Sequence, residues 1–271
     1  MSEPEPQRGA PPGSPLLEAG RRGPEGARMS FLAHLDELRR RLLRVALGLL
    51  VGVAASYAFG DEILEFLLGP VEDAVGDLTV IRPAEAFMNK IKAAFAGGLF
   101  VTLPWAFYQA WAFVAPGLYA RERKWVVPAV ACAFALFTVG AAFCYWVALP
   151  AAIGFLAEQA QAFESNVTVD HAFSFSVKLL FGMGLVFEMP LVIFVLARAG
   201  LVTARFLWKK LDLAVFFCFL TAAIITPTPD VLTMTIFALP MVALYLCGIV
   251  VAWLAAPRQA GQPTGGTERD E

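Results

Sequence analysis

Three acidic residues lie where the surrounding sequence makes an acid unexpected. Glu122 follows a Pro-Gly turn and is flanked by three basic residues, Glu37 precedes a run of arginines, and Glu188 lies deep inside an apolar stretch. A carboxylate at a basic membrane surface can bind an arriving cation. A guanidinium suits it best, because the two groups form two parallel hydrogen bonds. Glu122 and Glu37 are therefore candidates for a cation-binding site.

Both of these acids also have an ordinary explanation. Glu122 can pair with a neighbouring arginine, and a surface pair of this kind contributes about 0–1 kcal/mol. Glu37 precedes Arg40 and Arg41 by three and four residues, the spacing of a helical ion pair worth about 0.2–0.5 kcal/mol. The functional interpretation gains weight because both acids are expected at the same membrane face, in segments that are otherwise basic.

Glu188 and Asp230 pose a different question, because each stands beside prolines. An acid inside a membrane span costs roughly 2.5–3.5 kcal/mol, so Glu188 is expected to face a polar interior or a path, with Pro190 freeing a backbone carbonyl nearby. The alternative is a structural hydrogen bond to a neighbouring span. Asp230 lies in a Pro-rich turn, where it is expected to cap the following helix.

The composition indicates an integral membrane protein. Of 271 residues, 58% are hydrophobic and 16% are charged, whereas soluble domains have about 45–50% apolar and about 25% charged residues. The net charge of -2 gives no sign of nucleic-acid binding. The four cysteines lie in apolar runs without metal-site spacing, and no enzyme motif is present, so we expect no cofactor, no metal and no catalytic residue.

The apolar pattern predicts an all-α membrane protein with six transmembrane helices that are kinked and concave. The spans are expected at about 42–59, 87–115, 125–149, 173–199, 211–226 and 232–256. The fifth and sixth are expected to be short for a core of about 30 Å. A short surface helix in the first outer loop is expected to stop at Pro70, and the third span to end at Pro150. Prolines within spans are expected to kink them.

The basic residues predict the orientation. They gather near the N-terminal helix and in two inner loops, so both termini are expected in the cytoplasm. The predicted organisation is a disordered cytoplasmic tail at 1–28, a six-helix domain at 29–256 and a second disordered tail at 257–271.

Four motifs resemble the TatC family, the multispanning component of the twin-arginine protein translocase. They are HLDELRRRLL at 34–43, QAWAFVAPGLY with RER at 109–123, FEMP at 187–190 and TPTPD at 226–230. The resemblance covers about residues 30–256. It implies a receptor for folded cargo whose signal peptides carry consecutive arginines before an apolar segment, with transport driven by the proton-motive force.

The resemblance also implies roles for particular residues. Glu37 and Glu122 would bind the signal arginines, and Glu188 matches the buried polar residue of the family. Further matching positions are Arg39, Phe113, Pro70, Pro190 and Asp230. Near Asp230 this chain has Met234 where the family usually has Gln, so the sequence departs from the family at the position of that polar contact.

Partners and location follow from the same resemblance. The expected partners are twin-arginine signal peptides, small single-span TatB-like and TatA-like components, and membrane lipids, in an oligomeric complex. No transit peptide is evident, which favours a bacterial inner membrane over a thylakoid.

Three other functions fit parts of the sequence. A proton-coupled small-molecule transporter could use Glu188 as its carrier, but no internal repeat is visible. A channel lacks a filter-like loop. An interaction scaffold without its own signal site would bind a twin-arginine peptide normally after both Glu37 and Glu122 are replaced.

Overall fold

A computed structural model describes residues 31–76, 78–80, 82–114, 126–160, 167–226 and 230–255. The chain divides into two compact units, Met1–Arg40 and Arg41–Glu271. Of the first unit only the opening turns of one helix are described. The two tails predicted at 1–28 and 257–271 lie outside the described residues.

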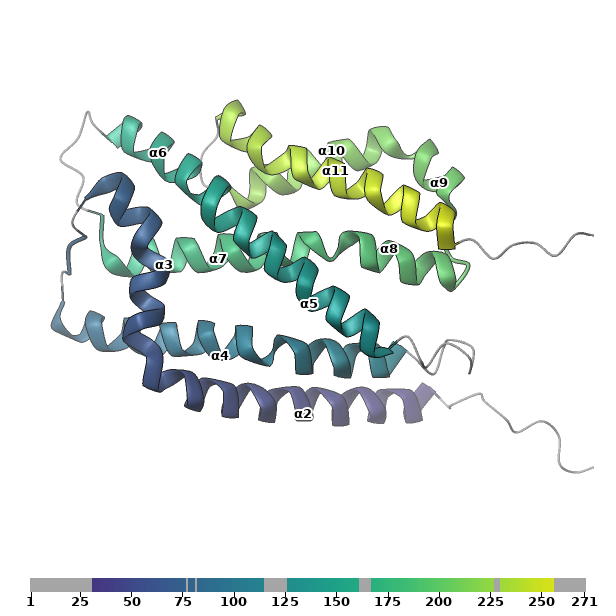
Figure 1. The fold of residues 1–271 in the computed structure, drawn as a ribbon, viewed down its shortest axis with the longest axis horizontal. Helices are drawn as coiled ribbons and strands as arrows, with labels where there is room; N and C mark the ends of the chain where they lie inside the picture. Colours follow the sequence, from purple (N-terminus) through teal and green to yellow (C-terminus); the bar gives the residue numbers. More distant parts are fainter. Residues whose placement is uncertain are drawn as a thin grey trace, which may run out of the picture. The chain divides into compact units, whose positions relative to one another are not determined.

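The described part of the chain is helical, apart from one isolated bridge between Thr79 and Thr168, and this confirms the predicted all-α class. Figure 1 shows the helices in chain order. They are α2 (Phe31–Ser56), the 3-10 turn η1 (Tyr57–Phe59), α3 (Gly60–Val75), α4 (Pro83–Val114), α5 (Val126–Phe143), the π-helical turn η4 (Cys144–Ala148), α6 (Leu149–Ala160), α7 (Val169–Phe187), α8 (Met189–Arg198), α9 (Ala204–Lys209), α10 (Leu211–Ile225) and α11 (Val231–Ala255).

Five helical stretches among the described residues are long and apolar enough to cross a membrane. They are Leu32–Val75, Ala84–Phe113, Val127–Glu158, Val169–Arg198 and Val231–Ala255. The fifth predicted span corresponds to α10, which has 15 residues and is therefore about 22 Å long. The expectation of a short sixth helix is wrong. The reason is that α11 starts directly after Asp230 and continues through Pro240 for 25 residues.

Pro70 does not stop the surface helix as predicted, because α3 continues past it to Val75. A proline in a helix leaves the carbonyl four residues earlier without its backbone donor. Here that carbonyl belongs to Phe66, and the hydroxyl of Tyr145 donates to it at 2.8 Å. The two rings also stack, with centroids 4.6 Å apart. A side chain from η4 therefore replaces the bond that Pro70 removes.

Pro150 does not end the third span either, and the helical path continues through α6 to Ala160. The π-helical turn η4 changes the hydrogen-bond pattern just before the proline, and the N–H of Leu149 donates to the carbonyl of Cys144. Pro150 then occupies the first turn of α6, where a helix has no need of the missing N–H. The span is thus longer than its sequence suggested.

Within the second unit, α2 packs closely on α4 through glycines. A Cβ added at Gly52 would lie 2.4 Å from the hydroxyl of Thr102, and one at Gly98 would lie 2.5 Å from the backbone nitrogen of Val53. Small residues allow this approach of two backbones inside a membrane, where packing rather than hydrophobic transfer holds helices together. The Thr102 hydroxyl also donates to the carbonyl of Gly98 at 2.7 Å.

Two clusters of buried apolar residues lie in the second unit. The larger one involves α3 to α7, α10 and α11, and includes Leu149, Leu179, Met183, Phe237 and Met241. The smaller one joins α8, α9 and the end of α11, with Ile193, Ala197, Leu207, Ile249, Ala252 and Ala255. The surface helix α3 runs steeply across α4 and α7 (Figure 1) and adds Leu67, Leu68 and Val71 to the larger cluster.

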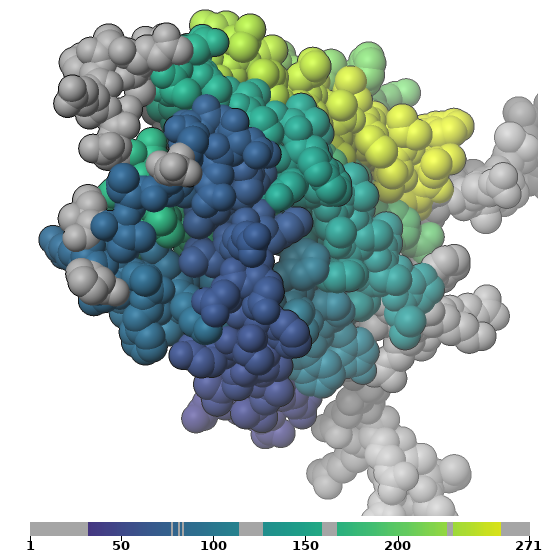
Figure 2. Space-filling view, turned by 60° about the vertical axis from the view of Figure 1, so that its left-hand side comes forward, coloured from purple at the N-terminus to yellow at the C-terminus, as the bar shows by residue number. Residues whose placement is uncertain are grey.

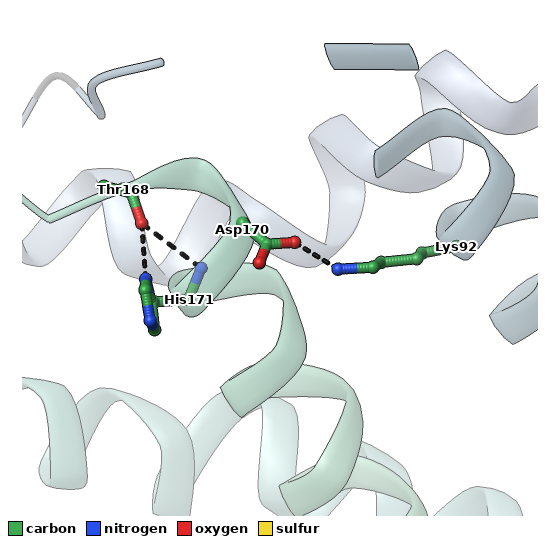
Figure 3. Close-up of polar contacts among 4 residues, drawn as sticks. All are labelled: Lys92, Thr168, Asp170 and His171. Carbon is green, nitrogen blue, oxygen red and sulfur yellow. Dashed lines mark hydrogen bonds and ion pairs between the residues drawn. The ribbon is translucent and has the colours of Figure 1, made fainter. Parts of the chain in front are cut away.

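The start of α7 is held by polar contacts that the sequence did not indicate (Figure 3). Thr168 caps α7: its hydroxyl accepts the N–H of His171 and lies 2.7 Å from Nδ1 of the same residue. Asp170 forms an ion pair with Lys92 of α4. On its other side α4 is joined to α3, because Lys90 pairs with Asp61. The two lysines of α4 therefore connect it to two different neighbours.

Candidate functional site

Glu37 and Arg39 lie in the described part of the first unit, in the opening turns of α2. The Glu37 side chain is half-buried, whereas Arg39 is exposed. The neighbouring acid, Asp36, accepts a hydrogen bond from Arg40 at 2.6 Å, one helical turn further on. Arg40 thus pairs with Asp36, and the two adjacent acids of this turn differ in burial, because Asp36 is exposed and Glu37 is half-buried.

Glu122 lies outside the described residues, together with the whole turn between α4 and α5. The structure therefore does not bring Glu37 and Glu122 together, and their joint site stays a prediction. Phe113 is half-buried in the last turn of α4, directly before this undescribed turn. Helix α4 ends at Val114 and α5 begins at Val126, on either side of the undescribed segment that contains Glu122.

Polar contacts connect α2 and α4 within the three turns that precede Phe113. Gln109 is 3% exposed, and its side-chain oxygen accepts a hydrogen bond from Arg41 at 3.4 Å. The indole N–H of Trp105 donates to the carbonyl of Arg44 at 3.1 Å. Sequence reasoning included Gln109 in a motif but gave it no role. A buried amide in an apolar span was the signal that could have identified it.

Glu188 lies at a break in the fourth predicted span, between α7 and α8. Pro190 has no N–H to donate to the carbonyl four residues earlier, and the path changes from one helix to the next at Glu188. The side chain is 8% exposed. Its Oε1 atom is buried and has no hydrogen-bond partner among the described residues. The structure thus contains a buried carboxyl group whose bonding capacity is not fully used.

The remaining predicted residues have structural roles. Asp230 accepts a hydrogen bond from the N–H of Thr233 at 2.6 Å, so it caps α11 as predicted. Pro190 is buried in the first turn of α8. Pro70 lies inside α3 rather than in a turn. These residues shape the helices, whereas Glu37 and Glu188 are the described acids that remain candidates for binding.

A groove of about 450 Å³ opens between α3, α4, α5 and α7. Part of its lining consists of small residues, namely Ala96, Gly97, Ala141 and Ala142. Aromatic rings from each of the four helices and from η4 border it. Figure 2 shows this face, with α4 set back between α3 and the teal helix α5. Such a groove, with Glu62 among mostly apolar lining residues, can hold an apolar chain or part of a helix.

Comparison with known families identifies the chain. The family model described as "Sec-independent protein translocase protein (TatC)" matches residues 33–240. The chain belongs to the TatC family. The matched range begins within the first turn of α2, before Glu37, and extends to Pro240 in α11, so it includes every predicted site residue. The resemblance stated from four motifs is thereby confirmed.

Individual relatives agree with this family. A TatC protein of Koribacter versatilis is 36% identical over 249 residues, which cover 90% of this chain and 92% of the relative. A TatC protein of Helicobacter pylori is 36% identical over 225 residues, covering 83% and 87%. A solved structure described as the twin-arginine translocase receptor TatC is 32% identical, with a TM-score of 0.71, and covers 82% of this chain and 99% of the other.

TatC membership decides several predictions. The chain is a component of the twin-arginine translocase, which contains other Tat components, and it is a transport protein rather than an enzyme. It is a multi-pass protein of the bacterial inner membrane, in agreement with its apolar helices. The transporter and channel alternatives are set aside by this assignment.

Proposed function

We propose that this TatC protein is the receptor that binds twin-arginine signal peptides at the cytoplasmic face, with Glu37 and Glu122 as the two carboxylates. The observation that supports the proposal most is the match to a solved protein described as the translocase receptor, over 99% of its length. The bound cargo is a folded protein, and transport is driven by the proton-motive force. The scaffold without a signal site is the competing function.

The chemistry of the two carboxylates explains the demand for arginine. A guanidinium is planar, permanently charged and able to form two parallel hydrogen bonds with one carboxylate. A lysine ammonium has a compact charge and cannot reproduce that pairing. Two acids separated in the sequence, one in α2 and one in the turn after α4, can therefore select two consecutive arginines over two lysines.

The nearby residues support different roles for the two acids of α2. In this proposal Glu37 binds the external guanidinium, whereas Asp36 pairs with Arg40 within the helix. Arg39 keeps the surface basic, and a basic surface attracts anionic lipid headgroups. Phe113, in the last turn of α4, supplies apolar surface near the Glu122 turn.

The apolar segment of the signal peptide requires a second surface. The groove between α3, α4, α5 and α7 is mainly apolar, which supports binding of such a segment. In the proposed arrangement the arginines lie at the cytoplasmic face while the apolar segment enters the membrane. This arrangement needs six spans with both termini in the cytoplasm, in which α10 is the short fifth span.

Glu188 is proposed to bind a small single-span partner, TatB-like or TatA-like. Its Oε1 atom has no hydrogen-bond partner among the described residues, and a polar side chain on a partner helix would satisfy it. Crosslinking within the membrane that never reaches α7 or α8 would count against this contact.

The receptor proposal is tested by photocrosslinking from position 113, which leaves Glu37 and Glu122 in place, to a twin-arginine peptide and to its twin-lysine version. We expect adducts with the arginine peptide and a strong decrease with the lysine peptide. Equal yields from the two peptides would contradict selection by paired carboxylates. The full chain in native membranes is used, so that partners remain present.

Variants of neighbouring acids sharpen this test. Glu37→Ala and Glu122→Ala are each expected to abolish crosslinking while the protein still inserts. Asp36→Ala is the matched control, because it removes one acid from the same turn but one that pairs with Arg40, and it is expected to retain crosslinking. Normal peptide binding by the Glu37→Ala/Glu122→Ala double variant would instead favour the scaffold function.

A further inference from the structure

A second depression of about 460 Å³ lies between α9 and the end of α11, away from the groove described above. It is lined by Ala204, Arg205, Trp208, Lys209, Ile249, Val250 and Trp253. Its composition is unusual for a membrane-facing surface, because two cations border a floor that is otherwise apolar. We propose that this depression is a binding site for an anionic phospholipid, with Arg205 and Lys209 holding the phosphate headgroup.

The two cations are available for a ligand. Arg205 and Lys209 are four residues apart in α9 and therefore lie on one face, about 6 Å apart along the helix axis. Both side chains are exposed. Neither forms an ion pair with another residue in the described ranges. Two adjacent cations without an acid partner repel each other, so a phosphate between them stabilises both.

The short helix α9 is held firmly enough to fix the position of these cations. Thr203 caps it by accepting the N–H of Phe206 at 3.2 Å. Leu207 is buried in the smaller apolar cluster, and the Tyr245 hydroxyl of α11 donates to its carbonyl at 2.8 Å. A chain reversal before α9 uses Gly200 at φ 74°, a conformation that favours glycine. A cation pair held in this way loses little conformational entropy on binding.

The surroundings indicate a lipid rather than a soluble anion or a protein. Trp208 is 61% exposed and Trp253 is 71% exposed, and exposed tryptophans with basic residues are typical of the membrane interface. Val250 continues the apolar surface along α11. A phospholipid matches both parts, with its phosphate at the cations and its acyl chain along the apolar floor. Basic pockets between membrane helices on the cytoplasmic side bind such headgroups in general.

The depression lies at the cytoplasmic side only in the orientation proposed above. The proximity of Arg205 to Lys209 does not depend on that orientation. Because lipid tails are as apolar as the protein surface, the floor alone gives little preference for one lipid. Selectivity must therefore come from the headgroup. An anionic lipid is preferred over a zwitterionic one only if the two cations contact it.

The test measures lipids retained by the full-length protein after extraction from vesicles of equal phosphatidylglycerol and phosphatidylethanolamine, by native mass spectrometry. The wild type is expected to retain phosphatidylglycerol preferentially. Lys209→Gln is expected to lower that preference about five-fold, and Arg205→Gln similarly. Lys210→Gln is the matched control, because Lys210 is also an exposed lysine but does not line the depression, and it is expected to leave the preference unchanged.

Two further variants separate a built site from a charged surface. Ala204→Leu fills the depression without changing charge and is expected to lower phosphatidylglycerol retention, whereas Ala243→Leu, at an exposed position of α11 outside it, is not. Lys209→Arg keeps the charge and is expected to retain the preference. Equal losses for Lys209→Gln and Lys210→Gln, or no loss for either, would overturn the proposal. No signal peptide enters this measurement, so its failure is distinguishable from failure of the receptor function.

Discussion

At the scale of single residues, the Phe66 carbonyl shows how a proline is accommodated within a membrane-protein helix. Pro70 leaves this carbonyl without its backbone donor, and Tyr145 supplies a hydroxyl from another part of the chain. An unsatisfied polar group is costly where water is scarce. The contact therefore makes Pro70 and Tyr145 depend on each other.

Replacement of Tyr145 by Phe is expected to lower the free energy of unfolding by about 1–3 kcal/mol, because the Phe66 carbonyl loses its donor while ring stacking persists. In a Pro70→Ala background the backbone N–H of residue 70 can make that bond. The same change is then expected to cost much less. Thermal unfolding of the four proteins in detergent gives the coupling energy, and strictly additive losses would contradict the proposed replacement.

The ion pair between Lys92 and Asp170 gives a second prediction at this scale. The two side chains are 40% and 35% exposed, so solvent screening limits the pair to about 1 kcal/mol. Lys92→Glu and Asp170→Lys are each expected to destabilise the protein, while the exchanged pair Lys92→Glu/Asp170→Lys regains most of the loss. Unfolding temperatures at low and high salt would check this. A double variant worse than both single variants would refute it.

At the scale of helices, the contact between α2 and α4 depends on glycines. Gly52→Leu is expected to cost about 1–3 kcal/mol, because its Cβ would lie 2.4 Å from the Thr102 hydroxyl and 2.8 Å from the Gly98 carbonyl oxygen. Ala54→Leu, at an exposed position of the same helix, serves as the control and is expected to be neutral. Limited proteolysis of the loops at increasing temperature distinguishes the two variants.

The helices also show what the sequence can and cannot predict. The apolar segments, the short α10 and the Asp230 cap were predictable, because each depends on nearby residues alone. The ends placed at Pro70 and Pro150 were wrong, since Tyr145 and the π-helical turn η4 compensate for those prolines. The Lys92–Asp170 pair was missed because its partners are 78 residues apart. For the candidate site, motifs indicated Glu37 and Glu188, but the position of Glu122 relative to them stays a prediction.

At the scale of the whole molecule, the length of α10 should make stability depend on the bilayer. Its length of about 22 Å is below the ~30 Å of a typical hydrocarbon core, and mismatch costs fractions of a kcal/mol per Å. We expect the protein to unfold at lower temperature in long-chain than in medium-chain phosphatidylcholine vesicles. A variant with α10 extended by one apolar turn should show the opposite preference. Equal unfolding temperatures in both lipids would argue against α10 as a span.

The two apolar clusters of the second unit have a mechanical consequence. The chain passes between them at three places, and two of these carry a helix defect: the break at Glu188 and the junction of α9 and α10 at Lys210. The third passage lies in α11 beyond Pro240, because Met241, Val242 and Leu244 still belong to the larger cluster. Each of the two defects interrupts regular helical bonding between residues of different clusters, so bending there leaves both clusters packed. The two points together form a joint at which we expect α8 and α9 to move relative to α7 and α10. The buried carboxyl group of Glu188 lies at one of these two points, so a partner that binds Glu188 would act where regular helical bonding is interrupted.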